Sequence, residues 1–360
     1  MLFNYVPNPD QSNWLQEFLT SLVKEALDAH VDGRAPRSWQ TMLAHPYSPI
    51  LESRRGLKSR YTHLTKTVKK MSSEQSSQLL ALLNSPSYYR EVLAGQVSYK
   101  PASGISDEFL EAMKSVYDFG FDLLGKLESA PGETETIRDR MYRLAYTAMP
   151  AHYCPFCGID RFDAPHSDMP RHALDHYLAI SEYPAFGTHL PNLVPMCGRC
   201  NSSFKLAADM LKADDGTSRA CVDPYGDQTA TISLMNSSPF GGGVDGQVPL
   251  WRIEFEPPSE AFETWDNVFK VRLRYSESFL DAEYHAWLDD FAKWGRDKQL
   301  SISNNQDASN ALNKWASLCP KLRDQGFLKR PMFEMLAACA LLPDANGARV
   351  TRLVRTLCAL

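Results

Sequence analysis

Four of the eight cysteines stand in two Cys-x-x-Cys pairs. The first pair is Cys154 and Cys157, and the second is Cys197 and Cys200. Two thiolate pairs on tight turns suit the four tetrahedral positions around a zinc ion. Because four cysteine ligands leave no position for water, the expected Zn2+ is structural. Two disulfides or plain buried thiols are the alternative, but nothing marks the chain as secreted, and paired Cys-x-x-Cys in a cytosolic protein indicates metal.

Five further polar residues lie between the two cysteine pairs or shortly after them. They are Asp175, His176, Asn192, Asn201 and Lys205. Asp175 and His176 are adjacent in a β-like run, residues 173–180, which predicts a hairpin that brings both side chains to one end. Lys205 falls four residues after Asn201, one turn along the same expected helix face, where its ammonium could touch a phosphate.

These residue types suit the hydrolysis of a phosphodiester. The reaction needs a base that takes a proton from water and a cation that stabilises charge on the phosphate and the leaving oxygen. His176 is the candidate base, because a histidine with a pKa near ~6.5 is neutral over much of the physiological range. Carboxylate and amide oxygens are hard ligands, so Asp175 and Asn201 are the candidate ligands of a catalytic Mg2+ or Mn2+.

Three motifs carry these residues in a fixed order. They are Asp175-His176-Tyr177, then Asn192-Leu193-Val194-Pro195, then Cys197-x-x-Cys200-Asn201-x-x-x-Lys205. This order resembles the HNH endonuclease family, in the branch whose ββα-metal core is pinned by two zinc-binding Cys-x-x-Cys pairs, and it covers only this core of the 360-residue chain. The resemblance implies that Asn192 braces the loop between two strands. It also implies that Asn201 replaces the last histidine of the pattern, an HNN variant.

The expected function is therefore that of a metal-dependent endonuclease acting on nucleic acid, with DNA as the expected substrate. His176 and Asn192 are the expected catalytic residues. Asp175 and Asn201 hold the catalytic metal, and Lys205 contacts the substrate. The alternative is a catalytically inactive, zinc-stabilised module that binds nucleic acid or a protein partner.

Control by a second protein is expected by analogy. The sequence holds no P-loop, so ATP-driven control would lie on another polypeptide. This pattern fits the effector nuclease of a bacterial anti-phage defence or mobile-element system, with a regulatory ATPase or another subunit of that system as partner. The chain has no apolar run of about 18 residues and no signal-peptide pattern, so no membrane contact is expected and the cytoplasm is the expected compartment.

The formal net charge of −5 is unexpected for a protein that binds DNA. Its distribution is uneven, because residues 34–70 hold nine bases against the single acid Glu52. Residues 321–360 hold seven bases against three acids. Phosphate contacts are therefore expected mainly from these two flanks. A solvated face or a surface for a protein partner is the alternative for each.

The elements that must position the site are helices on both sides of it. Apolar residues at helical spacing predict an all-α domain over residues 1–150. Within it, Ser72 and Gln75 precede an apolar run and predict a capping box. The nuclease core with its structural zinc is expected over residues 151–226, with the helix of its ββα unit over 201–211.

The rest of the chain is predicted to mix strands and helices. A Gly-rich loop at 237–249 and an antiparallel strand pair are expected within residues 227–280. The strand pair rests on two alternating runs, 251–255 and 269–275. Residues 281–360 are predicted to be helical, with Pro331 as the first residue of one helix. The predicted class is α+β: a zinc-pinned ββα core with an N-terminal all-α domain and a C-terminal region of β-hairpin and helices.

Overall fold

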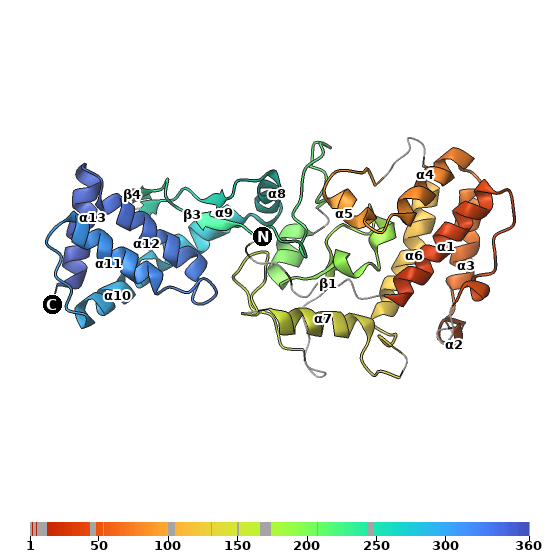
Figure 1. Cartoon of the computed structure of the whole chain (residues 1–360), viewed down its shortest axis with the longest axis horizontal. Coiled ribbons are helices and arrows are strands. Elements are labelled where there is room, and N and C mark those ends of the chain that lie inside the picture. The colour runs from red at the N-terminus through yellow and green to blue at the C-terminus, as the bar shows by residue number, and fades with distance from the viewer. Residues whose placement is uncertain are drawn as a thin grey trace. The chain divides into compact units, whose positions relative to one another are not determined.

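The computed structural model combines helices with small antiparallel sheets, so the predicted α+β class is confirmed (Figure 1). It describes residues 2, 5, 13–43, 48–52, 54–99, 105–130, 132–149, 151–165, 174–206, 208–242 and 248–359. The chain divides into two compact units. One comprises Asn4–Met149 and Arg161–Gln228, and the other comprises Met1–Phe3, Pro150–Asp160 and Thr229–Leu360. These units differ from the predicted segments, since most of the expected core shares a unit with the N-terminal helices.

Helices build most of the unit that contains Asn4–Met149. They are α1 (Trp14–Val31), the 3-10 turn η1 (Trp39–Met42), α2 (Ser48–Glu52), α3 (Leu57–Val68), α4 (Ser73–Asn84), α5 (Tyr88–Leu93), α6 (Asp107–Leu124) and α7 (Ile137–Ala148). Side-chain caps fix where several of them begin. The predicted capping box is confirmed: the Ser72 hydroxyl accepts from the Gln75 N–H, and the Gln75 side chain accepts from the Ser72 N–H.

Helix α6 is central to this unit. It packs against α1 and α3 (Figure 1). It also packs against η2 (Pro184–Phe186), a short turn in the predicted core. Its apolar face, which includes Phe109, Val116 and Leu124, is fully buried. A Cβ at Gly120 would lie 2.2 Å from a Leu19 methyl carbon and 2.8 Å from the Thr188 methyl carbon, so a larger residue would force these buried side chains to shift.

A short hairpin carries the residues predicted to do chemistry. Strand β1 (Leu174–His176) pairs antiparallel with β2 (Leu193–Pro195), with Asp175 opposite Val194 and His176 opposite Leu193. Between them lie η2 and a second 3-10 turn, η3 (Leu190–Asn192). After β2 the chain forms η4 (Cys200–Lys205), a single stretch of π-helix. The helix predicted over 201–211 is therefore too long, because Leu206, at φ 45°, ends it.

Two small sheets and a set of helices form the other unit. Strand β3 (Thr231–Ser233) pairs with β6 (Glu254–Glu256), and β4 (Ser238–Gly242) pairs with β5 (Val248–Leu250). The helices are α8 (Glu260–Phe269), α9 (Val271–Tyr275), the π-helical η5 (Ser276–Leu280), α10 (Asp281–Asp297), α11 (Asn305–Ser317), α12 (Gly326–Ala340) and α13 (Ala345–Cys358). Much of the predicted Gly-rich loop is thus the β4–β5 hairpin, and residues 243–247 lie outside the described residues.

The predicted strand pair of 251–255 with 269–275 is wrong. Strand β6 pairs with β3, and residues 271–275 are helical. The reason is local: Lys270, in the left-handed conformation, separates α8 from α9, and Arg272 then binds Glu263 and Asp266 of α8. A short alternating run cannot distinguish such helical turns from a strand. Pro331 also differs from its prediction, because α12 begins at Gly326 and Pro331 lies inside it.

The helices give no sign of a membrane segment. Among the described residues, none of them combines the length and the hydrophobicity that crossing a bilayer requires.

Candidate functional site

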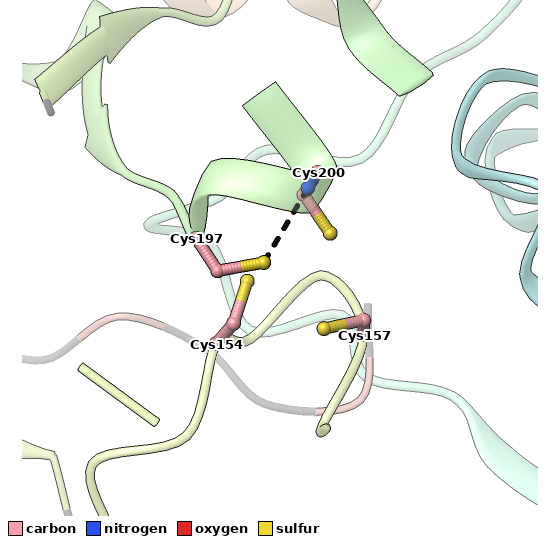
Figure 2. Close-up of side chains that lie close together, drawn as sticks. All are labelled: Cys154, Cys157, Cys197 and Cys200. Carbon is pink, nitrogen blue, oxygen red and sulfur yellow. Dashed lines mark hydrogen bonds between the residues drawn. The ribbon is translucent and has the colours of Figure 1, made fainter. Parts of the chain in front are cut away.

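The four paired cysteines lie together. The sulfurs of Cys154, Cys157, Cys197 and Cys200 are all within 4.8 Å of one another, and all four residues are fully buried (Figure 2). A tetrahedron of Zn–S bonds of about 2.3 Å places its sulfurs about 3.8 Å apart, so a single ion can reach all four with small adjustments. All four are free thiols rather than disulfides. The cluster can therefore bind a metal such as zinc, as the spacing predicts.

Aromatic side chains hold the first cysteine turn in place. The Trp265 indole N–H donates to the Phe156 carbonyl at 2.8 Å, and the Tyr275 hydroxyl donates to the Cys157 carbonyl at 2.8 Å. The Cys154 carbonyl accepts from the Cys157 N–H at 3.2 Å, which closes the turn. Helices α8 and α9 supply both aromatic donors. Sequence reasoning missed them because it assigned part of this region to a strand.

The second cysteine turn is tied to the hairpin. The Cys200 N–H donates to the Cys197 sulfur at 3.4 Å (Figure 2). The Asn201 N–H donates to the Cys197 carbonyl at 2.9 Å and so starts η4 directly after the turn. Strand β2 is braced from outside by the Tyr225 hydroxyl, which donates to the Leu193 carbonyl at 3.0 Å. Metal binding here would fix the position of Asn201.

His176 is held in one orientation and is largely buried. Its Nε2 lies 2.7 Å from the Gly187 carbonyl oxygen, and its exposed fraction is 9%. Because a carbonyl only accepts, Nε2 carries the hydrogen in a neutral ring and Nδ1 is left as the acceptor. Burial lowers the pKa of His176, with a smaller contribution from the Lys205 charge, while the Gly187 carbonyl and Asp175 oppose it. The neutral ring that can take a proton is thus favoured at pH 7.

Lys205 lies inside the protein and contacts Asp175. Its side chain is 2% exposed, and its ammonium nitrogen lies 2.9 Å from Asp175 Oδ2. The Asp175 side chain is 25% exposed. Within the described residues this oxygen accepts no aligned hydrogen bond, so the contact is an ion pair of loose geometry. The predicted metal ligand and the predicted phosphate contact are therefore paired with each other.

Asn192 is fully buried and binds the loop that follows β1. Its Oδ1 accepts from the Leu178 N–H at 2.7 Å, and its Nδ2 donates to the carbonyls of Leu178 at 3.0 Å and Phe186 at 3.1 Å. The Tyr89 hydroxyl adds a long contact of 3.5 Å to Oδ1. These bonds brace the loop in which Gly187 lies. Asn192 thus supports the loop that orients His176.

Asn201 stands apart from these contacts. It lies on η4 and is partly exposed. In the part of the chain that is described, its side chain makes no hydrogen bond, and no contact joins it to Asp175. Its amide oxygen is thus available as a ligand. The four cysteines are the one group of three or more His, Cys, Asp or Glu side chains there that could hold a metal.

Two residues of the site escaped sequence reasoning. The Phe121 ring of α6 packs on His176 with ring centroids 4.3 Å apart. The Arg138 guanidinium of α7 lies 4.4 Å from the centre of the Phe121 ring and donates to the Phe121 carbonyl at 2.8 Å. Arg138, Phe121 and His176 therefore form one cluster, in which the Phe121 ring contacts both of the other side chains. No sequence signal could have found it, because the contacts join segments far apart in the chain.

Comparison of the chain with models of known protein families, with curated proteins and with solved structures gave no match.

Proposed function

We propose that the protein is a metal-dependent HNH endonuclease that hydrolyses phosphodiester bonds in nucleic acid, with DNA as its substrate. The observation that supports this most is the state of His176. Its Nε2–H is fixed on the Gly187 carbonyl, and burial favours its neutral form. A general base needs both a free acceptor nitrogen and a fixed direction. Asp175 is adjacent to it on the same short strand.

Each residue has one role in this proposal. Nδ1 of His176 takes the proton from the attacking water, and Asn192 holds the loop that orients the ring. Asp175 and Asn201 supply a carboxylate and an amide oxygen, a set that fits Mg2+ or Mn2+. When bound, such an ion stabilises the charge on the phosphate and on the departing 3′ oxygen. The product then carries a 5′-phosphate. Phe121 excludes water from one face of the His176 ring.

Plasmid nicking by the His176→Ala protein tests the proposal. The wild-type chain should nick plasmid with Mg2+ or Mn2+ and stop when EDTA is added. The variant should be slower by about 100-fold or more, the usual contribution of a general base, at unchanged zinc content. His285→Ala is the matched control, because His285 is an exposed histidine on α10. Undiminished nicking by His176→Ala would remove the proposed base.

The Lys205–Asp175 ion pair favours a second candidate. An aspartate already neutralised by a buried ammonium can be part of a module that binds nucleic acid or a protein and cuts nothing. The same plasmid assay separates the two. Retarded migration on a gel without metal-dependent nicking supports the binding module. Nicking that depends on metal and on His176 supports the enzyme.

A further inference from the structure

The exposed surface of α3 is basic and lacks acidic residues. Helix α3 carries Lys58, Arg60, His63 and Lys66 and contains no aspartate or glutamate. The whole chain has a formal net charge of −5, so the positive charge of this helix is opposite in sign to that of the chain. A charged helix on the surface of a protein usually mixes both signs.

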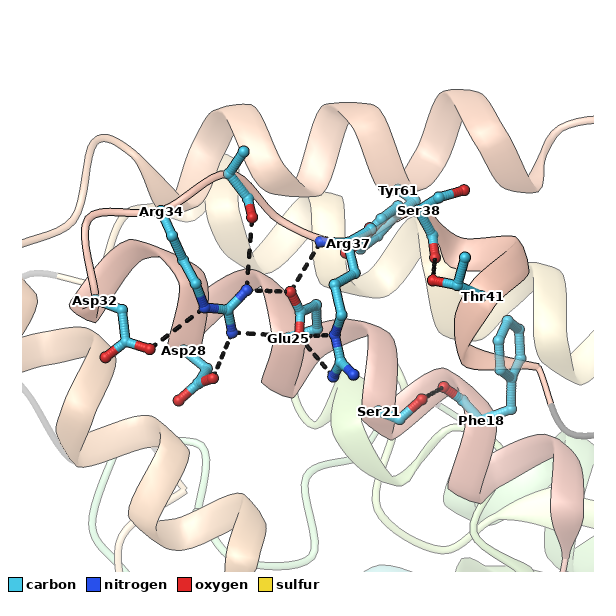
Figure 3. Close-up of polar contacts among 11 residues, drawn as sticks. Phe18, Ser21, Glu25, Asp28, Asp32, Arg34, Arg37, Ser38, Thr41 and Tyr61 are labelled. Carbon is cyan, nitrogen blue, oxygen red and sulfur yellow. Dashed lines mark hydrogen bonds and ion pairs between the residues drawn. The ribbon is translucent and has the colours of Figure 1, made fainter.

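The structure separates the bases of residues 34–70 into two groups. In the first group, Arg34 and Arg37 bind the buried Glu25, and Arg34 also binds Asp28 at 2.5 Å (Figure 3). Lys70 binds Glu108 at 2.6 Å. These bases are already paired with acids of α1 and α6, so they are not free to bind a partner.

Arg60 also belongs to this first group. Its Nε donates to the Ser115 carbonyl at 3.0 Å, and its guanidinium lies 4.9 Å from the centre of the Phe119 ring. It therefore attaches α3 to α6.

The second group is exposed and unpaired. Its members are Arg54, Arg55, Lys58, Lys66 and Lys69. None of these five side chains has an acidic or hydrogen-bonding partner within the described residues. Lys58 and Lys66 are two turns apart on one helix face, with Thr62 between them. Together with Gly56, Ser59 and His63 these three residues line a hollow on that face. We call Arg54, Arg55, Lys58, Lys66 and Lys69 the α3 basic surface.

The direction of this surface follows from the contacts of α3 with α6. Arg60 contacts Ser115 and Lys70 contacts Glu108, so the two helices run antiparallel. The start of α3 therefore lies toward the end of α6 that carries Phe121, the residue that packs on His176. Phe121 is rotated by about 200° from Phe119, so it points to the side of α6 opposite to Arg60. At 1.5 Å per residue, Ser115 and Phe121 are about 9 Å apart along α6.

From these unpaired bases we propose that the α3 basic surface binds the phosphate backbone of duplex DNA. From Lys58 to Lys69 the surface extends about 16 Å, the length of about five nucleotides of one strand. Unpaired cations in a row, without acids between them, match a polyanion better than they match a protein surface of mixed charge. This inference rests on the proposed nuclease function for its substrate, but its test does not need cleavage.

The experiment compares two triple variants on a His176→Ala background, which prevents cleavage during binding. One is Lys58→Gln, Lys66→Gln and Lys69→Gln, and the matched control is Lys293→Gln, Lys298→Gln and Lys314→Gln. The control lysines are exposed, have no described partner and lie on or beside α10 and α11. Both variants lose the same charge, and glutamine preserves helix propensity. Fluorescence anisotropy with a 20-base-pair duplex at several salt concentrations gives the affinity and its salt dependence.

The α3 variant should bind about tenfold more weakly or worse at 0.1 M salt. Its slope of log K against log salt should be smaller by about 0.9 for each lost phosphate contact, up to about 2.7 in total. The control variant should match the parent. Equal losses in both variants would assign the effect to net charge and overturn the proposal, as would an α3 variant that binds like its parent.

The same proteins with His176 restored distinguish this inference from the proposed function. If wild type never nicks plasmid but the α3 variant loses DNA binding, the surface stands and the nuclease proposal fails. If wild type nicks with metal and the α3 variant binds and nicks equally well, the nuclease proposal stands and the surface is wrong.

Discussion

Replacing Lys205 with methionine tests whether its ammonium competes with a cation for Asp175. Methionine keeps a long, flexible, apolar stem in the space of the lysine, so packing is largely preserved. At 2.9 Å and an effective dielectric of about 20, the attraction between the two charges is about 6 kcal/mol. Burying the ammonium costs several kcal/mol and offsets most of this. Since Asp175 is 25% exposed and can be hydrated, we expect the unfolding free energy to change by less than about 2 kcal/mol.

We expect the Lys205→Met substitution to change the metal affinity more clearly than it changes the stability. Without the ammonium, Asp175 is an unopposed anion, and its affinity for Mn2+ should rise at least about tenfold, which corresponds to about 1.4 kcal/mol. Isothermal titration of the zinc-loaded protein with Mn2+ measures this directly. Lys212→Met, a change at an exposed lysine, is the matched control.

Two results would refute this reasoning. Equal Mn2+ affinity in wild type and Lys205→Met would show that the ion pair does not compete with the metal. Equal affinity in Asp175→Asn would show that Asp175 is no ligand at all. Nicking gives an independent readout: if Lys205 also contacts the phosphate, the methionine variant should bind Mn2+ more tightly and yet cut more slowly.

Two further predictions concern the stability of the fold. Burial raises the pKa of Glu25, but the hydrogen bonds from Arg34 and Arg37 outweigh it and lower the pKa to about 2 (Figure 3). The ionised Glu25 contributes about 3 kcal/mol to the free energy of unfolding above pH ~4.5, and this contribution is lost as the pH falls toward 2. The Glu25→Gln protein should therefore unfold at a lower urea concentration than wild type at pH 7. Its free energy of unfolding should also change less than that of wild type between pH 4.5 and pH 2. Cys197→Ser should lose zinc and fold poorly, measured by metal content and circular dichroism; a stable zinc-free protein would contradict a structural cluster.

Features that depend on neighbouring residues were predicted from the sequence. The capping box at Ser72 and Gln75 needs only four consecutive positions, and the structure has it. The spacing of the Cys-x-x-Cys pairs sufficed to predict the sulfur cluster, because each pair forms its own turn. The hairpin at Asp175 and His176 followed from an apolar run and is present, with strands shorter than the run.

Features that depend on distant contacts were not predictable. Val271 and Tyr275 alternate with polar residues as in a strand, yet the binding of Arg272 to acids of α8 keeps this segment helical. No sequence pattern predicts the contact between Phe121 of α6 and His176. Arg34 and Arg37 pair with an acid that lies outside residues 34–70, and a count of the bases in that stretch does not include it. The sequence therefore predicted more free bases than the structure has.

The two halves of the proposed chemistry are prepared to different degrees. The base is oriented before any ligand binds, since Gly187 fixes the His176 ring and Asn192 fixes the loop that carries Gly187. The carboxylate, in contrast, is neutralised by Lys205. A divalent ion that binds Asp175 Oδ2 would displace the ammonium, and the released ammonium would then need a new anion. A substrate phosphate is such an anion, so metal and DNA should each bind better in the presence of the other. The Lys205→Met protein should lose this mutual effect while it keeps the oriented base.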